Sequence, residues 1–239
     1  MAIQAGETTF YQAKRGIVQD GLVLNLDAAV DASYSGGTTW RDLTGGNNGT
    51  LTNMTFADNY NTDNGGSFTF DGTDEYISVP SFTSDLPSHS FSLELVFKWD
   101  SYGTDNIDFI TAGADEELEI HTGGGAGTNG LRFIPYDHPG SETQGTLDNP
   151  NIITNDINHI VFTAEHSSPS KSYKSGELFL TSSTTSTITL TSSTFYIGRR
   201  GSGAFPFGGN IHTLKVYNRA LTATEVLQNY NATRHRFGV

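Results

Sequence analysis

Residues 208–237 read Gly208-Gly-Asn-Ile-His-Thr-Leu-Lys-Val-Tyr-Asn-Arg-Ala-Leu-Thr-Ala-Thr-Glu-Val-Leu-Gln-Asn-Tyr-Asn-Ala-Thr-Arg-His-Arg-Phe237. From Ile211 to Val216 the side chains alternate with the period of a strand, with mixed polarity on each face. Thr222 is followed three residues later by Glu225, which is the pattern of a capping box. The segment therefore predicts a closing strand, a turn and one short helix over residues 223–230.

The rest of the chain predicts short strands separated by Gly, Asn, Asp and Ser. The clearest strand runs from Phe91 to Trp99, where one alternate set is entirely apolar and is expected to face the core of a half-buried strand. Further strands are expected at residues 109–112, 118–121, 131–134, 159–163, 177–180 and 195–197. Abundant threonine and a single convincing helix favour an all-β fold, a two-sheet antiparallel β-sandwich with one short C-terminal helix.

Three further motifs precede this segment in the chain. They read Gly21-Leu-Val-Leu-Asn-Leu-Asp27, Trp40-Arg-Asp42-Leu-Thr-Gly-Gly-Asn-Asn48-Gly-Thr-Leu51 and Gly66-Ser-Phe-Thr-Phe-Asp71-Gly-Thr-Asp74-Glu-Tyr-Ile77. Together with residues 208–237 they resemble laminin G-like domains of the concanavalin A-like lectin/glucanase type. The resemblance implies a jelly roll over residues 21–239. Residues 1–20 form an N-terminal extension that is an attachment arm, an added strand or a disordered end.

The closing motif also indicates a biological setting. Tyr217-Asn-Arg-Ala-Leu-Thr222, with a trailing Arg236-Phe-Gly238, is similar to copies of this domain in tailed-phage virion proteins. The resemblance implies a capsid decoration or a tail or fibre component, with capsid or tail proteins as partners. It further implies assembly in the host cytoplasm and a place on the virion surface. Association into a homo-oligomer is left open.

Charge is divided unevenly along the chain, whose net charge is −13. Residues 199–239 hold six Lys and Arg against one acidic residue, whereas the remaining twenty-five acidic residues lie before them. An acidic body repels phosphates and argues against nucleic-acid binding. The basic end is expected to dock an acidic partner, together with an aromatic arm, unless its charges are simply solvated. The docking candidates are Phe10, Tyr11, Arg199, Arg200, Arg234 and Arg236.

Cellular location is constrained by what the sequence lacks. It contains no cysteine, which excludes disulfides and thiolate metal sites. The first residues lack the basic and apolar regions of a signal peptide, and no apolar run reaches membrane-spanning length. We therefore expect neither export by the ordinary route nor insertion into a membrane.

One acidic triplet raises the question of catalysis. Asp115, Glu117 and Glu119 would share one face of a strand, and laminarinase-like hydrolases of this fold carry three acidic residues with this spacing. Here the family's Glu-x-Asp-x-Glu order is changed to Asp-x-Glu-x-Glu. The two tryptophans, Trp40 and Trp99, lie in structural motifs and offer no sugar platform. The alternative is a solvated acidic strand, so we expect a protein that is not an enzyme.

Two kinds of binding site remain. Asp42, Asp71 and Asp74 lie in the family's signature loops and could hold a structural calcium, since calcium prefers oxygen ligands. The alternative is turn chemistry, in which Asp side chains accept from nearby backbone amides. No cofactor is otherwise required.

Aromatic residues are the candidates for glycan contact. Tyr102, Tyr136 and Phe205 are expected to offer exposed rings that stack on sugars, with neighbouring polar groups supplying hydrogen bonds. The leading hypothesis is a non-enzymatic virion surface protein with a lectin-like fold that binds cell-surface glycans. A free carbohydrate-binding module is the second hypothesis, and a glycoside hydrolase is the third.

Overall fold

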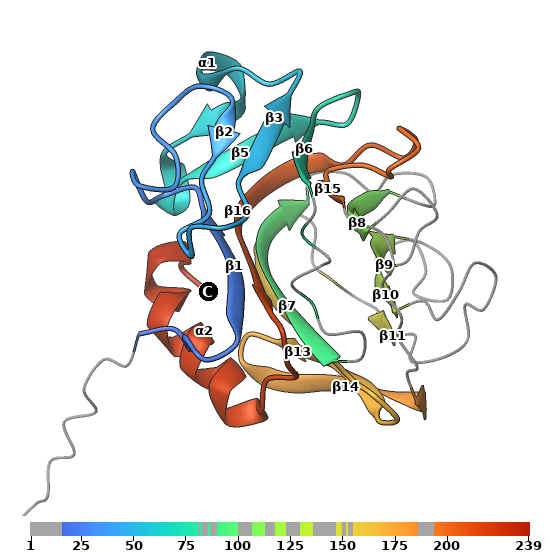
Figure 1. The fold of residues 1–239 in the computed structure, drawn as a ribbon. Helices are drawn as coiled ribbons and strands as arrows, with labels where there is room; N and C mark the ends of the chain where they lie inside the picture. The colour runs from blue at the N-terminus through green and yellow to red at the C-terminus, as the bar shows by residue number, and fades with distance from the viewer. Residues whose placement is uncertain are drawn as a thin grey trace, which may run out of the picture.

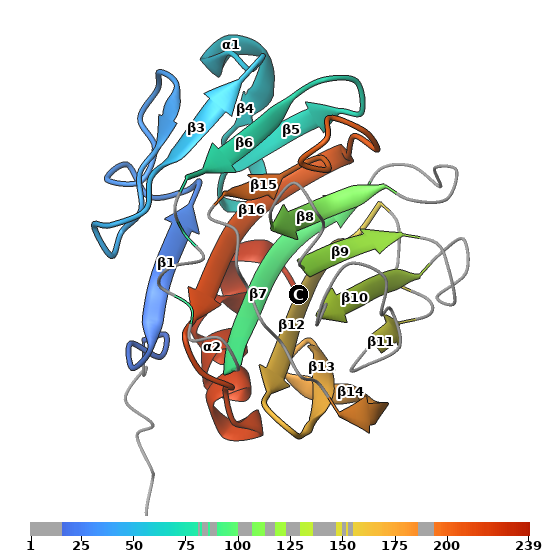
Figure 2. The same ribbon diagram turned by 45° about the vertical axis from the view of Figure 1, so that its right-hand side comes forward.

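The computed structural model describes residues 16–80, 82, 86, 90–99, 107–112, 118–122, 130–135, 147–149, 152, 155–185 and 194–239. Within these residues two antiparallel sheets of eight strands each pack face to face (Figure 1, and turned in Figure 2). The expected all-β sandwich with one short C-terminal helix is confirmed. Two single-turn elements, α1 (Phe56–Asn59) and η1 (Asp63–Gly65), lie in connections.

The two sheets have the following strand orders. Sheet A runs β14 (Glu177–Thr185), β13 (Pro169–Lys174), β12 (Ile157–Glu165), β7 (Ser90–Trp99), β16 (Gly208–Tyr217), β5 (Ser67–Asp71) and β4 (Tyr60–Asn61), with β1 (Leu22–Asp27) also paired to β16. Sheet B runs β11 (Leu147–Asn149), β10 (Leu131–Pro135), β9 (Leu118–Thr122), β8 (Asp108–Ala112), β15 (Phe195–Ile197), β6 (Tyr76–Val79), β3 (Gly49–Thr52) and β2 (Thr39–Trp40).

Strand β16 lies at the centre of sheet A. One of its edges pairs with β7, while β1 and β5 share the other edge. Gly209 permits the close approach to β7, since its φ is +148° and a Cβ there would lie 2.3 Å from the carbonyl oxygen of Lys98. Any side chain at this position would force the two strands apart.

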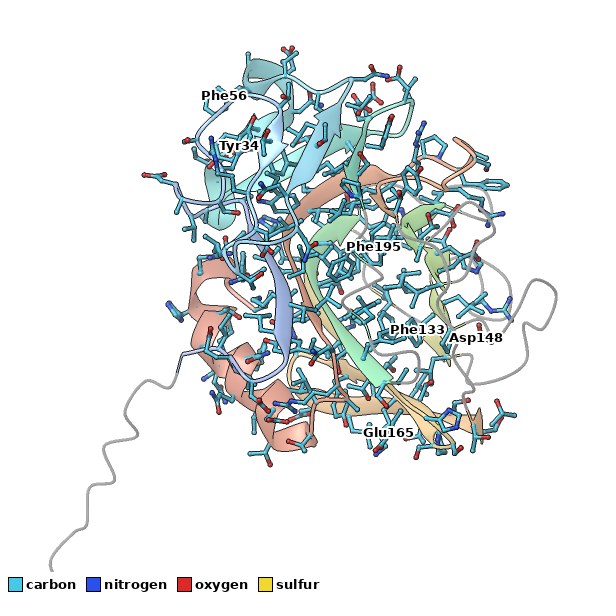
Figure 3. All side chains as sticks on the ribbon, in the orientation of Figure 1. Tyr34, Phe56, Phe133, Asp148, Glu165 and Phe195 are labelled. Atoms are coloured by element: carbon cyan, nitrogen blue, oxygen red, sulfur yellow. The ribbon has the colours of Figure 1, made fainter. Side chains whose placement is uncertain are left out.

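The core lies between the sheets, and the predicted inward face of β7 is confirmed. Its apolar alternate residues are at most 1% exposed, from Phe91 to Trp99. Phe97 packs edge-on against Phe109 of sheet B, with ring centroids 5.0 Å apart. Figure 3 shows Phe133 and Phe195, both fully buried, pointing between the sheets.

The prediction that β7 is only half-buried is wrong. Ser92, Glu94 and Val96, on its other face, are also fully buried. The reason is the helix α2 (Ala223–Phe237), which lies across the outer face of sheet A (Figure 1). A second, smaller apolar cluster forms in this interface from Val18, Val161, Tyr173, Tyr217, Leu221 and Val226.

Helix α2 begins as predicted and ends later. The capping box is present, because Thr222 Oγ1 accepts from the Glu225 amide at 3.3 Å and Glu225 Oε2 accepts from the Thr222 amide at 2.9 Å. The helix continues past Tyr230 to Phe237, where Gly238 adopts the left-handed conformation that caps a helix end. In the described part of the chain no helix is long and apolar enough to cross a membrane.

A buried polar network joins α2 to sheet A. The carboxylate of Glu94 accepts from Lys215 Nζ at 3.0 Å, from Asn229 Nδ2 at 2.6 Å, and lies 3.4 Å from His159 Nε2. Asn229 Nδ2 also donates to the Tyr217 hydroxyl at 2.8 Å. Burial alone would raise the pKa of Glu94, but the Lys215 ammonium and His159 outweigh burial and hold that pKa well below its ordinary value. We call these five residues the Glu94 network.

The same helix holds the start of the described chain. The Val18 amide donates to Asn229 Oδ1 at 2.8 Å, and Gln228 Nε2 donates to the Gly16 carbonyl at 2.8 Å. Val18 is buried. The described residues that contact α2 therefore begin at Gly16.

Candidate functional site

The outer face of sheet B carries polar and aromatic side chains. Along β6, β9 and β15, alternate residues point into the core, so the intervening residues face outward. The outward residues are Tyr76, Ser78, Glu119, His121 and Tyr196. Asp148 on β11 lies on this outer side as well (Figure 3).

Two acidic residues of this face share one arginine. A β-bulge in β8 between Asp108 and Ile110 turns Asp108 to the outer face, opposite His121. Arg200 Nε lies 2.9 Å from Asp108 Oδ2, and Arg200 Nη2 lies 3.0 Å from Glu119 Oε1. Both carboxylates are buried. The arrangement neutralises the guanidinium and fixes Arg200 in place.

The turn between β15 and β16 holds an aromatic ring above this arginine. The amide of Arg200 donates to the Ala204 carbonyl at 3.0 Å, and the Asp108 amide donates to the Phe205 carbonyl at 3.0 Å. Phe205 has a φ of +56°, a strained conformation for a bulky residue. Its ring lies 4.6 Å from the Arg200 guanidinium carbon, and the residue is 36% exposed. The surrounding hydrogen bonds hold the ring where solvent reaches it.

A second arginine lies between two tyrosines. The guanidinium carbon of Arg199 is 3.4 Å from the ring centroid of Tyr76 and 5.8 Å from that of Tyr196. All three residues are half-buried, and the two rings are 6.3 Å apart. We call Tyr76, Tyr196, Arg199, Arg200 and Phe205 the arginine–aromatic face. It combines aromatic surface with directional N–H donors.

Of the three aromatic residues expected to contact sugars, Phe205 is placed in this face, whereas Tyr102 and Tyr136 lie outside the described residues. Sequence reasoning missed Tyr76 and Tyr196. A signal for both existed, because each alternates with core residues on a short strand and must therefore point outward.

The acidic triplet is only partly described. Asp115 and Glu117 lie outside the described residues, and Glu119 is the carboxylate paired with Arg200. Trp40 and Trp99 are both fully buried in the core. Neither tryptophan is available as a sugar platform, as expected.

The four arginines proposed for docking do not form one surface. Arg199 and Arg200 follow β15 of sheet B, whereas Arg234 and Arg236 belong to α2, the helix on the outer face of sheet A (α2 and β15 are labelled in Figures 1 and 2). Arg200 forms ion pairs with the buried carboxylates of Asp108 and Glu119 and is not available to a partner. Arg236 Nη1 pairs with Asp27 Oδ2 at 2.8 Å, so it is an internal contact as well. Arg234 is exposed, and the arm residues Phe10 and Tyr11 lie outside the described residues.

Asp42, the first predicted calcium ligand, is a turn residue. Its buried carboxylate accepts hydrogen bonds from the Thr44 hydroxyl and from four backbone amides, those of residues 25, 44, 46 and 47. The lone pairs of this carboxylate are already used by these donors, so few remain to coordinate a metal ion.

The other two aspartates have local partners of their own. Asp71 Oδ1 accepts from the Thr73 amide at 2.7 Å, and Asp74 Oδ2 accepts from Asn53 Nδ2 at 2.9 Å. Among the described residues, no group of three or more acidic or histidine side chains is arranged to hold a metal ion. The three aspartates are therefore not gathered into one ligand set, and they do not fit the predicted structural calcium.

Another exposed aromatic group lies on and beside the helix α1. Phe56 on α1 is 51% exposed and stacks on Tyr60, with centroids 5.1 Å apart. Tyr34 packs beside Phe56, with ring centroids 5.9 Å apart (Figure 3). No charged side chain stacks on these rings in the described structure, so this group lacks the combination found on sheet B.

Comparison with known families and structures agrees with the fold. The model of the concanavalin A-like lectin/glucanases superfamily matches residues 71–227, more than half of the chain. No curated protein sequence matches the chain.

Several solved structures share the fold at low sequence identity. Trypanosoma rangeli sialidase in complex with sialic acid has a TM-score of 0.66 at 17% identity, covering 90% of this chain and 33% of the sialidase. Domain 4 of a GH43 extracellular arabinanase from Geobacillus stearothermophilus, in complex with arabinotriose, has a TM-score of 0.63 at 21% identity, covering 87% and 98%. Botulinum neurotoxin type C, which depends on two ganglioside molecules for cell entry, has a TM-score of 0.67 at 15% identity, covering 89% and 51%.

These identities establish a shared fold and nothing finer. The chain spans about a third of the sialidase and half of the neurotoxin chain.

Proposed function

Because the chain belongs to the concanavalin A-like lectin/glucanases superfamily, we propose that it is a glycan-binding domain that uses the arginine–aromatic face. One observation carries the proposal: the exposed ring of Phe205 is held in a strained backbone conformation above Arg200. Strain of this kind persists where the surroundings impose it, and it gathers at ligand-binding sites. A fixed aromatic ring binds the apolar face of a sugar, and neighbouring polar groups orient the hydroxyls.

Structural neighbours support a carbohydrate as the ligand. The sialidase and the arabinanase domain were both solved with sugars, and the neurotoxin interacts with gangliosides. The sugars named for these three proteins differ, namely sialic acid, arabinotriose and gangliosides, so sharing the fold does not choose the glycan. The choice must come from the residues of the face itself.

The proposed domain binds without cleaving. A retaining hydrolase needs one free carboxylate as nucleophile and one protonated carboxyl as acid. Glu119 is instead ion-paired to Arg200, which also holds Asp108. Purified protein should therefore release no reducing sugar from β-glucans. Sustained release that is lost in Glu119→Gln would establish the hydrolase instead.

The finer proposal is that this domain belongs to a tailed-phage virion, as a capsid decoration or a tail or fibre component. It rests on the likeness of Tyr217–Thr222 and Arg236–Gly238 to phage copies, and on no geometric observation. The protein should co-purify with particles through successive density gradients. If it never does so, a free carbohydrate-binding module becomes the better account.

Glycan binding is tested by a matched pair of aromatic substitutions. Phe205→Ala should weaken binding by about tenfold or more, because aromatic contacts contribute on the order of 1 kcal/mol beyond burial. Phe56→Ala removes an exposed ring that is not part of the arginine–aromatic face and should leave binding unchanged. Calorimetry against a panel of neutral and acidic oligosaccharides gives the readout. Binding to no member of the panel, or equal binding by Phe205→Ala, would refute this use of the face.

A further inference from the structure

We propose that Arg199 binds the anionic group of an acidic sugar, so that the ligand is a glycan carrying a carboxylate or a sulfate. This inference rests on the proposed glycan-binding function and narrows its ligand class. It begins from the charges on the outer face of sheet B. Arg132 pairs with Asp148 at 3.0 Å, and Arg200 pairs with two buried acids. No carboxylate lies within ion-pair distance of Arg199 among the described residues.

The geometry around Arg199 fixes its orientation. Its guanidinium carbon lies over the Tyr76 ring, 3.4 Å from the centroid, and a Cβ at Gly203 in the neighbouring turn would lie 3.5 Å from Nη1. Stacking occupies the flat side of a guanidinium and leaves the N–H groups at its edge directed outward. Arginine donors held in a fixed fork match the oxygens of a carboxylate or sulfate.

One donor of this arginine has no acceptor among the described residues. The Nε atom is buried and makes no hydrogen bond. A buried donor on a charged group is costly when it is left unsatisfied, so the Arg199 guanidinium gains no compensation through Nε and depends on the N–H groups of its other two nitrogens. The backbone carbonyl of Arg199 is already engaged by the Thr111 hydroxyl at 3.2 Å, so the main chain at this position is anchored. The residue is held in place, yet no carboxylate of the described residues pairs with its charge.

The surroundings favour a sugar acid over a free anion. Tyr196 is half-exposed and Phe205 is exposed on the same face, so an anionic group at Arg199 can be joined to a ring that contacts aromatic surface. The net charge of −13 repels anions at long range. At physiological salt the Debye length is only about 8 Å, so contact at Arg199 outweighs that repulsion. An acidic glycan should thus bind through close contacts rather than electrostatic steering.

The experiment compares acidic glycans with neutral counterparts. Sialyllactose is set against lactose, oligogalacturonate against its methyl ester, and a sulfated disaccharide against the unsulfated one. The wild-type protein should bind at least one acidic member about 10- to 100-fold more tightly than its partner, the range expected for a charge-assisted hydrogen bond. Arg199→Gln should remove that preference, so that the acidic and neutral partners bind with equal affinity. Arg199→Lys should retain part of it, and Arg234→Gln, an equal charge loss on α2, should retain all of it.

The outcomes separate the two proposals. Equal affinity for acidic and neutral partners, or an unchanged preference in Arg199→Gln, overturns the role of Arg199 and leaves glycan binding standing. Binding to no glycan of either kind ends both proposals. If Arg199→Gln melts well below the wild type, the proposal is tested on the wild type alone, by measuring its glycan affinities at increasing salt concentration. Acidic-glycan affinity must then fall with added salt while neutral affinity holds, and two parallel responses would refute the proposal.

Discussion

Replacing Glu94 by glutamine should destabilise the protein by about 4 kcal/mol. Lys215 is 1% exposed, and its ammonium donates to Glu94 Oε1 at 3.0 Å. Removing one partner of a buried ion pair costs about 3–5 kcal/mol, because the other charge is left uncompensated. A buried lysine that instead gives up its proton at pH 7 costs about 4.6 kcal/mol, which bounds the effect from a second direction. At about 2–4 °C per kcal/mol for a domain of this size, the melting temperature should fall by roughly 8–16 °C.

The measurement is urea unfolding followed by the fluorescence of Trp40 and Trp99, both buried in the core. Glu165→Gln, an exposed glutamate at the end of β12, serves as the control and should change stability by less than about 0.5 kcal/mol (Figure 3). The double variant Glu94→Gln/Lys215→Met removes both charges and should recover most of the loss. A cost below about 1 kcal/mol for Glu94→Gln, or a double variant as unstable as the two single changes added, would refute the reasoning.

The pH dependence of the same variant has a definite sign. The pKa of Glu94 is held far below its ordinary value, so the carboxylate adds stability above the unfolded-state pKa of about 4.3. That stability is lost as the pH falls toward the folded-state pKa. The gap between wild type and Glu94→Gln should be full at pH 6 and should close as the pH falls below about 4. A gap that stays constant with pH would mean that the carboxylate charge is not the stabilising element.

Four further outcomes are expected. Gly209→Ala should cost at least about 3 kcal/mol in urea unfolding, since the new Cβ meets a backbone oxygen at 2.3 Å; a loss under 1 kcal/mol would contradict the packing. Phe205→Gly should be about 1 kcal/mol more stable than Phe205→Ala, because glycine accepts φ +56° without strain; the reverse order would count against the strain argument. Burial lowers the pKa of His212 to about 4, so protonation of the unfolded chain should remove about 3 kcal/mol between pH 6.5 and pH 4, a loss that His212→Gln should not show. Calcium should leave the melting temperature unchanged, because Asp42 is saturated by amides, and a rise reversed by a chelator would restore the metal site.

The parts of the fold that depend on local pattern could be predicted from the sequence. Strand periodicity correctly assigned the inward face of β7, since alternation needs only neighbouring residues. The burial of its other face depends on α2, which lies more than a hundred residues further along the chain. Helix α2 continues to Phe237 although it contains Asn231 and Thr233, which are poor helix formers. Tertiary contact overrides that weak preference, and Gly238 supplies the stop.

The candidate site shows the same division. The outward direction of Tyr196 follows from its strand pattern. Its aromatic neighbour Tyr76 comes from β6, and the two rings meet because the pairing of β15 with β6 places Ile197 opposite Ile77. Nothing in the local sequence says that Arg200 will be neutralised by buried acids while Arg199, beside it, will not. That difference arises from the bulge that turns Asp108 outward, a feature of pairing rather than of composition.

The hydrogen bonds between α2 and the first described residues determine which side of the molecule lies next to an attachment at those residues. Gly16 is tied to the helix through Gln228, and Gly238 closes the same helix, so the first described residue and the C-terminal residues both lie in the layer behind sheet A. The arginine–aromatic face looks out from the opposite layer. A tether attached next to these residues would therefore hold the sandwich on the sheet A side and leave the arginine–aromatic face exposed to solvent. Protein coupled to a sensor surface through residues of this layer should keep its arginine–aromatic face accessible. Coupling through random surface groups should block that face in a fraction of the molecules.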